Sequence, residues 1–288
     1  MPSADIEIDT DLVRRLLLAQ HPDLADCQIV PVAHGWDNVI MRLGEDLTVR
    51  LPRRAAAAGI IEHEQRWLPL LAPSLPLPIP APVRVGRPSD AFPWVWSIGP
   101  WFGGAPAALG PMDESDAVAR SLGAFLTALH RPAPADAPHN PHRGIALAGR
   151  GERFEADLAK AAGLIDRDRV RQVFAGAAAA PPWSAPPVWL HGDLHPANIL
   201  LDGGRITAVI DWGDVCGGDP ASDLAVAWMM FGDRARHVLR STRRADDACW
   251  ARARGWAVAL ALACLANSAD NPMIERIGAV TLARATSV

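Results

Sequence analysis

Tyrosine is absent from this chain of 288 residues, and Lys160 is the only lysine, so almost every basic side chain is an arginine. The four cysteines, which lie between Cys27 and Cys264, form no CxxC pair. Such spacing argues against a zinc site or a disulfide framework and is typical of a reducing, cytoplasmic environment. The net charge of −4 likewise gives no basis for a nucleic-acid or membrane-surface partner.

Long hydrophobic runs are also missing. The longest covers 256–266, well short of the roughly 20 residues that a membrane span requires. The N-terminal stretch 1–10 is acidic and polar, unlike a signal peptide. The apolar run is therefore predicted to be a buried helix, and we expect a cytoplasmic monomer.

The periodicity of the apolar residues predicts an α+β chain in two lobes. A small β-rich lobe is expected over 1–104 and a mostly helical lobe over 105–288, with Asp9 capping a first helix and the Gly- and Pro-rich stretch 99–111 joining the lobes. In the first lobe we expect strands at 28–33, 39–43, 47–51, 83–85 and 94–98 and a helix at 55–71. In the second we expect helices at 112–130 and 152–180 (one or two), β-rich runs at 188–190 and 199–210, and helices thereafter.

The strongest local signal is the sequence HGDLHPAN at 191–198, followed by DWG at 211–213. It fits the H-x-D-L-x-x-x-N and D-x-G spacing of phosphoryl transfer. The carboxylate of Asp193 would meet the acceptor hydroxyl, while the amide oxygen of Asn198 and the carboxylate of Asp211 would hold a metal between the nucleotide phosphates. Oxygen ligands of this kind suit magnesium, so Mg²⁺ and a nucleotide donor, ATP or GTP, are the expected cofactors.

The same block, continued by GDPASDLA at 218–225, resembles the central signature of the aminoglycoside phosphotransferase family, which includes antibiotic kinases and related small-molecule kinases. The resemblance implies a protein-kinase-like fold. It implies that Asp193 is the catalytic base and that Asn198 and Asp211 are the metal ligands. It also implies that His191, Asp219 and Asp223 support the site, with Asp223 capping a helix and bracing the catalytic loop.

A nucleotide cradle is expected in the first lobe. Gly35 and Asn38 belong to the connection between the first two predicted strands, where kinases place the loop that covers the phosphates, although an ordinary hairpin turn fits equally well. The purine is expected to meet backbone groups at the end of the last strand, at Ser97, Ile98 and Gly99.

Kinases usually contact the α- and β-phosphates with a lysine of the third strand, and here Arg50 is the basic residue of that strand. Its expected partner is a glutamate of the following helix. Glu64 lies on an apolar stripe with Leu68, whereas Glu62 lies on a polar one. Because a carboxylate on an apolar stripe needs a cation nearby, we predict that Glu64 pairs with Arg50.

The acceptor is defined less sharply. From 219 to 288 there are seven acids and nine arginines, a balance of +2 (9 − 7), and the same region holds a cluster of tryptophan and methionine. This favours a macrolide-like acceptor with few charges over a polycationic aminoglycoside. Two other hypotheses stay open: a metabolic kinase for an amino alcohol or sugar, and a nucleotide-binding pseudoenzyme.

Overall fold

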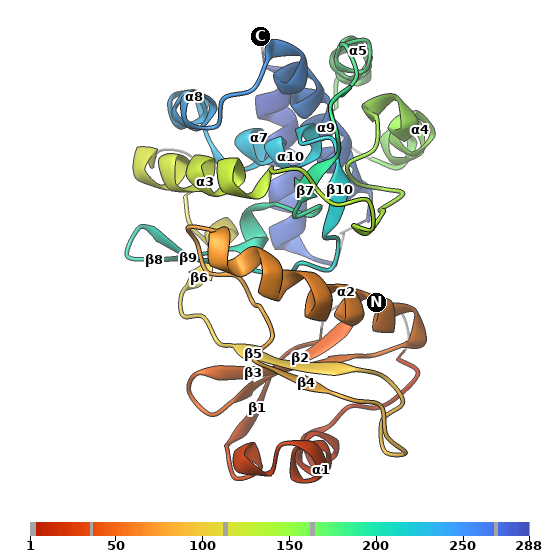
Figure 1. Ribbon diagram of the computed structural model, residues 1–288. Helices are drawn as coiled ribbons and strands as arrows, with labels where there is room; N and C mark the ends of the chain where they lie inside the picture. Colours follow the sequence, from red (N-terminus) through yellow and green to blue (C-terminus); the bar gives the residue numbers. More distant parts are fainter. Residues whose placement is uncertain (1–3, 35–36, 112–114, 162–164, 268–269, 288) are drawn as a thin grey trace. The chain divides into compact units, whose positions relative to one another are not determined.

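The computed structural model describes residues 4–34, 37–111, 115–161, 165–267 and 270–287 (Figure 1). Within these residues the chain forms two compact units. The first unit comprises Met1–Pro73 and Pro78–Gly103, and the second comprises Ser74–Leu77 and Gly104–Val288.

The first unit is built on an antiparallel sheet in the order β1-β2-β3-β5-β4. The strands are β1 (Ile29–His34), β2 (Asn38–Leu43), β3 (Leu47–Pro52), β4 (Arg84–Gly86) and β5 (Trp96–Pro100). Alternate residues of β2 and β3, including Met41 and Val49, are buried in one core with Trp96 and the apolar face of helix α1 (Thr10–Gln20). This alternation is the period of a strand with one covered face.

Two helices complete this unit. The side chain of Asp9 caps α1 by accepting from the backbone N–H of Leu12 at 2.7 Å, as predicted. Helix α2 (Ala55–Leu71) has the predicted bounds and buries Glu64 among apolar side chains. The last predicted strand begins later than expected, because the chain at Trp94 has not yet joined the sheet.

Helices dominate the second unit (Figure 1). They are α3 (Asp116–Leu129), α4 (Gly151–Lys160), α5 (Arg167–Ala178), α6 (Ala221–Leu224), α7 (Val226–Met230), α8 (Asp233–Thr242), α9 (Asp247–Asn267) and α10 (Pro272–Thr286). The described part of α3 is capped by Ser115, whose side chain accepts from the N–H of Val118 at 3.2 Å. The predicted start of this helix at 112–114 lies outside the described residues.

Helix α9 is the centre of this unit and packs against α10, α5, α6 and α4. By length and composition it is the one described helix that could cross a membrane, but 61% of its most apolar window is buried inside the protein. Its burial agrees with the buried helix predicted for 256–266.

Short strands of the second unit position the site. The hairpin β8 (Ile199–Asp202) and β9 (Arg205–Val209) is joined by β6 (Ala105–Pro106), so part of the predicted linker is a strand. A separate ladder pairs β7 (Val188–Leu190) with β10 (Cys216–Gly218). Strand β7 was predicted, whereas β10 was not. Both ladders end next to the residues of the sequence motif.

Candidate active site

The catalytic loop begins where β7 ends. His191 and Gly192 follow the strand directly, and Gly192 has a φ of +86°. A Cβ at this position would collide with the backbone oxygen of Asp214, so only glycine fits. The chain thereby turns sharply and brings Asp193 next to the loop that contains Asp214.

Asn198 holds the two halves of the motif together. Its side-chain nitrogen donates to the backbone oxygen of Asp193 at 2.9 Å, and its backbone oxygen accepts from the N–H of Ile210 at 2.9 Å. Asp211 follows Ile210 directly. The three residues predicted to react or to hold the metal therefore lie on two hydrogen-bonded segments of one unit.

Asp211 has a φ of +62°, the left-handed conformation, which costs free energy for a residue other than glycine. Such strain persists only where surrounding contacts fix the backbone. Here Trp212 is fully buried and its indole N–H donates to the oxygen of Val209 at 2.9 Å. The buried Trp212 therefore helps to hold Asp211 in this left-handed conformation.

The donor set suits a hard cation. Because the Asn198 amide nitrogen donates to the backbone oxygen of Asp193, its amide oxygen takes no part in that hydrogen bond and would be a candidate metal ligand. Together with the Asp211 carboxylate it supplies two oxygens, the ligand type that Mg²⁺ takes alongside nucleotide phosphates. Among the described residues no group of three or more His, Cys, Asp or Glu side chains forms a protein-only metal site.

The supporting residues brace this loop from behind. Asp223 accepts from the backbone N–H groups of His191 at 2.8 Å and Gly192 at 2.9 Å. The His191 ring contacts the backbone oxygen of Ile210 at 3.0 Å through Nε2 and accepts from the N–H of Asp193 through Nδ1. Asp223 thus ties down the strand-to-loop turn, and His191 ties the two motif segments together.

One expected detail of Asp223 is wrong, because it lies inside α6 rather than at its cap. The cap-like contact belongs to Asp219, whose Oδ1 accepts from the N–H of Ala221 at 3.0 Å. Asp219 is also paired with the buried Arg252 at 2.8 Å. The sequence carried no sign of this partner, which lies 33 residues away on α9.

His130 is a supporting residue that the sequence did not reveal. It is the C-cap of α3, and its Nε2 lies 3.3 Å from Oδ2 of Asp223. Arg243 donates to Nδ1 at 3.3 Å, so the neutral ring carries its hydrogen on Nε2 and donates it to the carboxylate. Burial lowers the pKa of His130 despite its contact with Asp223.

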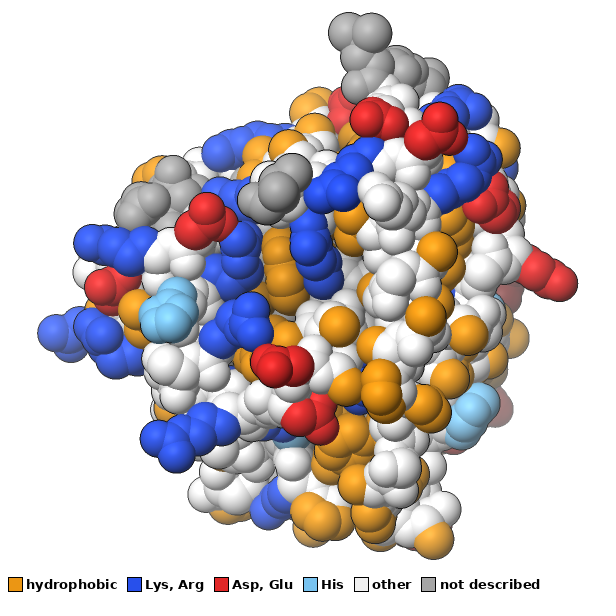
Figure 2. Space-filling view, turned by 90° about the horizontal axis from the view of Figure 1, so that it is seen from above, with side chains coloured by type: hydrophobic (Ala, Val, Ile, Leu, Met, Phe, Trp, Pro, Cys, Tyr) orange, Lys and Arg blue, Asp and Glu red, His pale blue; other side chains and the backbone are white. Residues whose placement is uncertain are grey.

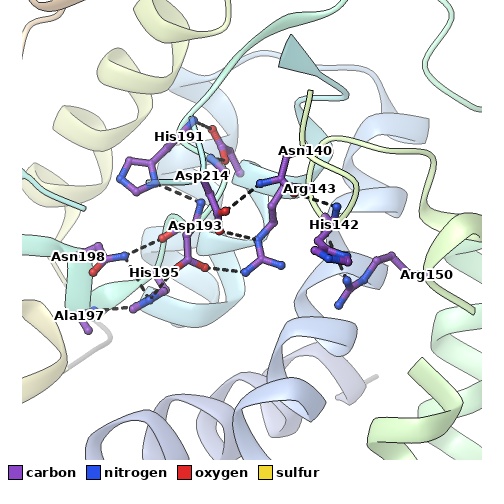
Figure 3. A network of polar contacts seen from close by, with 12 residues as sticks. Asn140, His142, Arg143, Arg150, His191, Asp193, His195, Ala197, Asn198 and Asp214 are labelled. Atoms are coloured by element: carbon purple, nitrogen blue, oxygen red, sulfur yellow. Dashed lines mark hydrogen bonds and ion pairs between the residues drawn. The ribbon is translucent and has the colours of Figure 1, made fainter. Parts of the chain in front are cut away.

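Arg143 is a further residue that sequence reasoning missed. Its guanidinium donates to Oδ1 of Asp193 at 2.9 Å and lies 3.7 Å from a carboxylate oxygen of Asp214 (Figure 3). Arg143 sits in a loop without a recognisable motif, and 50 residues separate it from Asp193. Only the folded chain brings them together.

The charges around Asp193 favour its ionised form. Burial would raise the pKa of this carboxyl, but His195 and Arg143 outweigh burial and hold the pKa well below its usual range. Burial, together with the charges of Asp193 and Asp211, raises the pKa of Asp214, although Arg143 opposes that shift. The site thus keeps Asp193 able to accept a hydrogen bond from a hydroxyl.

In the first unit, the predicted ion pair between Arg50 and Glu64 is present, with Nη2 and Oε1 3.2 Å apart. Glu64 is 3% exposed, whereas Glu62 is exposed. The side-chain oxygen of Asn38, turned toward β3, accepts from Nε and Nη2 of Arg50 at 3.2 and 3.0 Å. Gly35 lies outside the described residues.

The predicted purine-contacting residues belong to β5. Ser97 and Ile98 pair with β3 on one side and with β4 on the other, so the sheet uses their backbone groups. Gly99 pairs with β3 alone. Backbone contact with a purine stays a prediction, and among these three residues the pairing pattern favours Gly99.

Comparison with known proteins bears on the family and the fold. The model of the phosphotransferase enzyme family (APH) matches residues 28–256. An aminoglycoside 3'-phosphotransferase of Escherichia coli is 30% identical over 124 residues, which cover 42% of this chain and 46% of that protein. An uncharacterized Bacillus subtilis protein, YcbJ, is 37% identical over 65 residues, covering 22% of this chain and 21% of YcbJ. The chain thus spans less than half the length of these two curated relatives.

Solved structures show the same fold at low identity. The GDP and kanamycin complex of APH(2")-IIIa superposes with a TM-score of 0.68 at 19% identity, covering 94% of this chain and 97% of that one. Macrolide 2'-phosphotransferase MphH from Brachybacterium faecium superposes with a TM-score of 0.62 at 24% identity, covering 95% and 98%. The predicted fold class is thereby confirmed, and with most of its length matched by the family model, this chain belongs to the phosphotransferase enzyme family.

Proposed function

We propose that this protein is a magnesium-dependent phosphotransferase that moves the γ-phosphate of ATP or GTP to a hydroxyl group of a small molecule. The observation that carries this proposal is the hydrogen-bonded arrangement of Asp193, Asn198 and the strained Asp211. Asp193 would orient the acceptor hydroxyl, and Asn198 and Asp211 would hold Mg²⁺. When bound, Mg²⁺ would neutralise phosphate charge.

The first unit supports nucleotide binding in this proposal. The Arg50–Glu64 pair would keep the guanidinium directed at the α- and β-phosphates, and Asn38 would add a second contact to it. Structures of family members with GDP, ADP and ATP make a purine nucleotide the natural donor.

The acceptor we propose is an antibiotic, an aminoglycoside or a macrolide, whose phosphorylation would confer resistance. The charge balance of 219–288 is a weaker argument for a macrolide than it was from the sequence. Arg252, Arg254 and Arg276 bind a carboxylate or backbone oxygens within the protein, so they do not define the charge of an acceptor site. Trp228 and Trp250 are buried core residues. The face drawn in Figure 2 mixes basic, acidic and hydrophobic side chains without a broad acidic patch among the residues drawn in colour.

A magnesium titration tests the reaction class. The wild type should turn over ATP or GTP only with Mg²⁺, and Asp211→Ala should need far more Mg²⁺ because it removes a full charge from the ion. Asn198→Ala should show the same defect more mildly. An unchanged Mg²⁺ requirement in Asp211→Ala would place the metal elsewhere, and a wild type that binds nucleotide without turnover would be a pseudoenzyme.

The acceptor is tested separately. A sensitive host expressing the protein should become resistant to one class in matched panels of aminoglycosides and macrolides, and Asp193→Asn should abolish that resistance. Purified protein should then phosphorylate the same compounds. Turnover of amino alcohols or sugars, with none of the antibiotics, would instead identify a metabolic kinase.

A further inference from the structure

Arg143 connects two loops that carry the candidate chemistry. Its Nη2 donates to Oδ1 of Asp193 at 2.9 Å, and its Nε lies 3.7 Å from Oδ2 of Asp214, three residues after Asp211. The other oxygen of Asp214 accepts from the side-chain nitrogen of Asn140 at 2.8 Å. Figure 3 shows this chain of contacts, with Arg143 between the two carboxylates.

The backbone that presents Arg143 is itself anchored. The N–H of His142 donates to the side-chain oxygen of Asn140 at 2.8 Å, which closes a turn just before Arg143. Directly after it, the oxygen of Gly144 accepts from the N–H of Asp219 at 2.8 Å. The Arg143 side chain is only 18% exposed. It is therefore a fixed part of the site and not a mobile surface arginine.

Stability alone does not account for this arrangement. Removing a guanidinium from water costs free energy that a buried ion pair only roughly offsets, so such a pair contributes little net stability. What a guanidinium offers is direction, because its donors lie in a rigid plane. With its backbone anchored on both sides and the Asp214 carboxylate 3.7 Å from its Nε, Arg143 can fix the rotation of the Asp193 carboxylate.

The two carboxylate oxygens of Asp193 have different contacts. Oδ1 is occupied by Arg143, whereas Oδ2 lies 3.4 Å from Nε2 of His195, too far for a strong hydrogen bond. The His195 ring is held by the N–H of Ala197, which donates to Nδ1 at 3.2 Å. The Asp193 side chain is 33% exposed. Because Nδ1 accepts, the ring hydrogen of neutral His195 is on Nε2, and its contact with Oδ2 is longer than that of Arg143 with Oδ1, so Oδ2 is the more accessible oxygen for a hydroxyl.

We propose that Arg143 is a positioning residue that pins Oδ1 of Asp193 and so presents Oδ2 to the acceptor hydroxyl. This inference rests on the proposed phosphotransfer. In that step the acceptor oxygen forms a bond to the γ-phosphorus while the bond from that phosphorus to the β–γ bridging oxygen breaks. The hydroxyl proton passes to Oδ2 of Asp193, and the nucleoside diphosphate leaves. Arg143 stays protonated throughout and touches no reacting atom.

A double-mutant cycle tests the inference without knowledge of the natural acceptor, since water can serve as the acceptor in hydrolysis of Mg·ATP or Mg·GTP. Arg143→Gln should lower kcat about 10- to 100-fold, the scale expected when a reacting group is misplaced by about 1 Å. Its nucleotide Kd should stay within about twofold of wild type. In the Asp193→Asn background the same substitution should cost little more, because Arg143 acts through that carboxylate.

Two further variants separate positioning from folding. Arg143→Lys keeps the charge but loses the planar fork, so it should recover less than half of the lost rate on a logarithmic scale. Arg153→Gln removes a different cation, one 2.8 Å from the buried Asp157, and should leave kcat unchanged. Equal losses from Arg143→Gln in both backgrounds, or near-normal kcat in folded Arg143→Gln, would overturn the inference. Absence of any nucleotide turnover by the wild type would overturn the proposed function and this inference with it.

Discussion

In the first unit, the role of a single residue could be predicted where a charged side chain was expected to be buried. Glu64 could be chosen over Glu62 because a carboxylate on an apolar stripe requires a cation, and Arg50 is that cation. Arg143 gave no such signal. Its partners Asp193 and Asp214 are distant in sequence, and a lone arginine in a loop has no periodicity to interpret.

The Arg50–Glu64 pair makes a prediction at this scale. Arg50→Ala should raise the nucleotide KM and lower kcat, and Glu64→Ala should do both more mildly, because the guanidinium loses its anchor. In a steady-state double-mutant cycle, the double variant should lose less than the sum of the single losses. Strict additivity would mean that Glu64 acts independently of Arg50.

Among the elements, α2 could be predicted closely because its apolar period is long and Pro73 follows it. Strand β10 could not, since Cys216-Gly217-Gly218 has neither alternation nor β-branched residues and forms a strand only by pairing with β7. The formation of β10 therefore depends on tertiary pairing and not on local sequence. The motif loops, by contrast, were located by spacing alone.

Two helical glycines provide a matched test of packing. Gly255 of α9 has room for no side chain, because a Cβ there would collide with Leu147 and come within 2.5 Å of Ala177. Gly176 of α5 has open space around it. Gly255→Ala should destabilise the protein by about 1–3 kcal/mol, whereas Gly176→Ala should stabilise it by about 0.5–1 kcal/mol. Urea denaturation measures both, and stabilisation by Gly255→Ala would contradict the close packing of α9.

His130, the C-cap of α3, should make the stability of the protein depend on pH. Burial holds the pKa of His130 below its usual value near 6.5, although Asp223 and Asp219 oppose this and Arg243 adds to it. The unfolded chain therefore binds a proton that the folded chain does not, and stability falls as pH drops through about 6.5. His130→Gln should flatten the dependence of the unfolding free energy between about pH 7 and pH 5. An equally steep dependence in the variant would show that His130 is not its source.

At the scale of the whole molecule, arginine performs almost every task of a basic side chain, including the nucleotide contact proposed for Arg50 and the carboxylate bridge made by Arg143. The two units share this feature. The sequence order of a β-rich part followed by a helical part was enough to predict their content, since each buries its own apolar residues.

The absence of lysine from the first unit has a consequence for chemical probing. Acyl-phosphate nucleotides label kinases by transferring their acyl group to a lysine amine near the phosphates, and a guanidinium does not react because it stays protonated. Mass spectrometry should therefore find no nucleotide-protected acylation on β3, where Arg50 stands, and only background labelling at the exposed Lys160 of α4. Arg50→Lys should gain labelling at that position that excess ATP prevents. A survey of cellular kinases by lysine-directed acyl-phosphate probes would therefore fail to detect nucleotide binding by this protein.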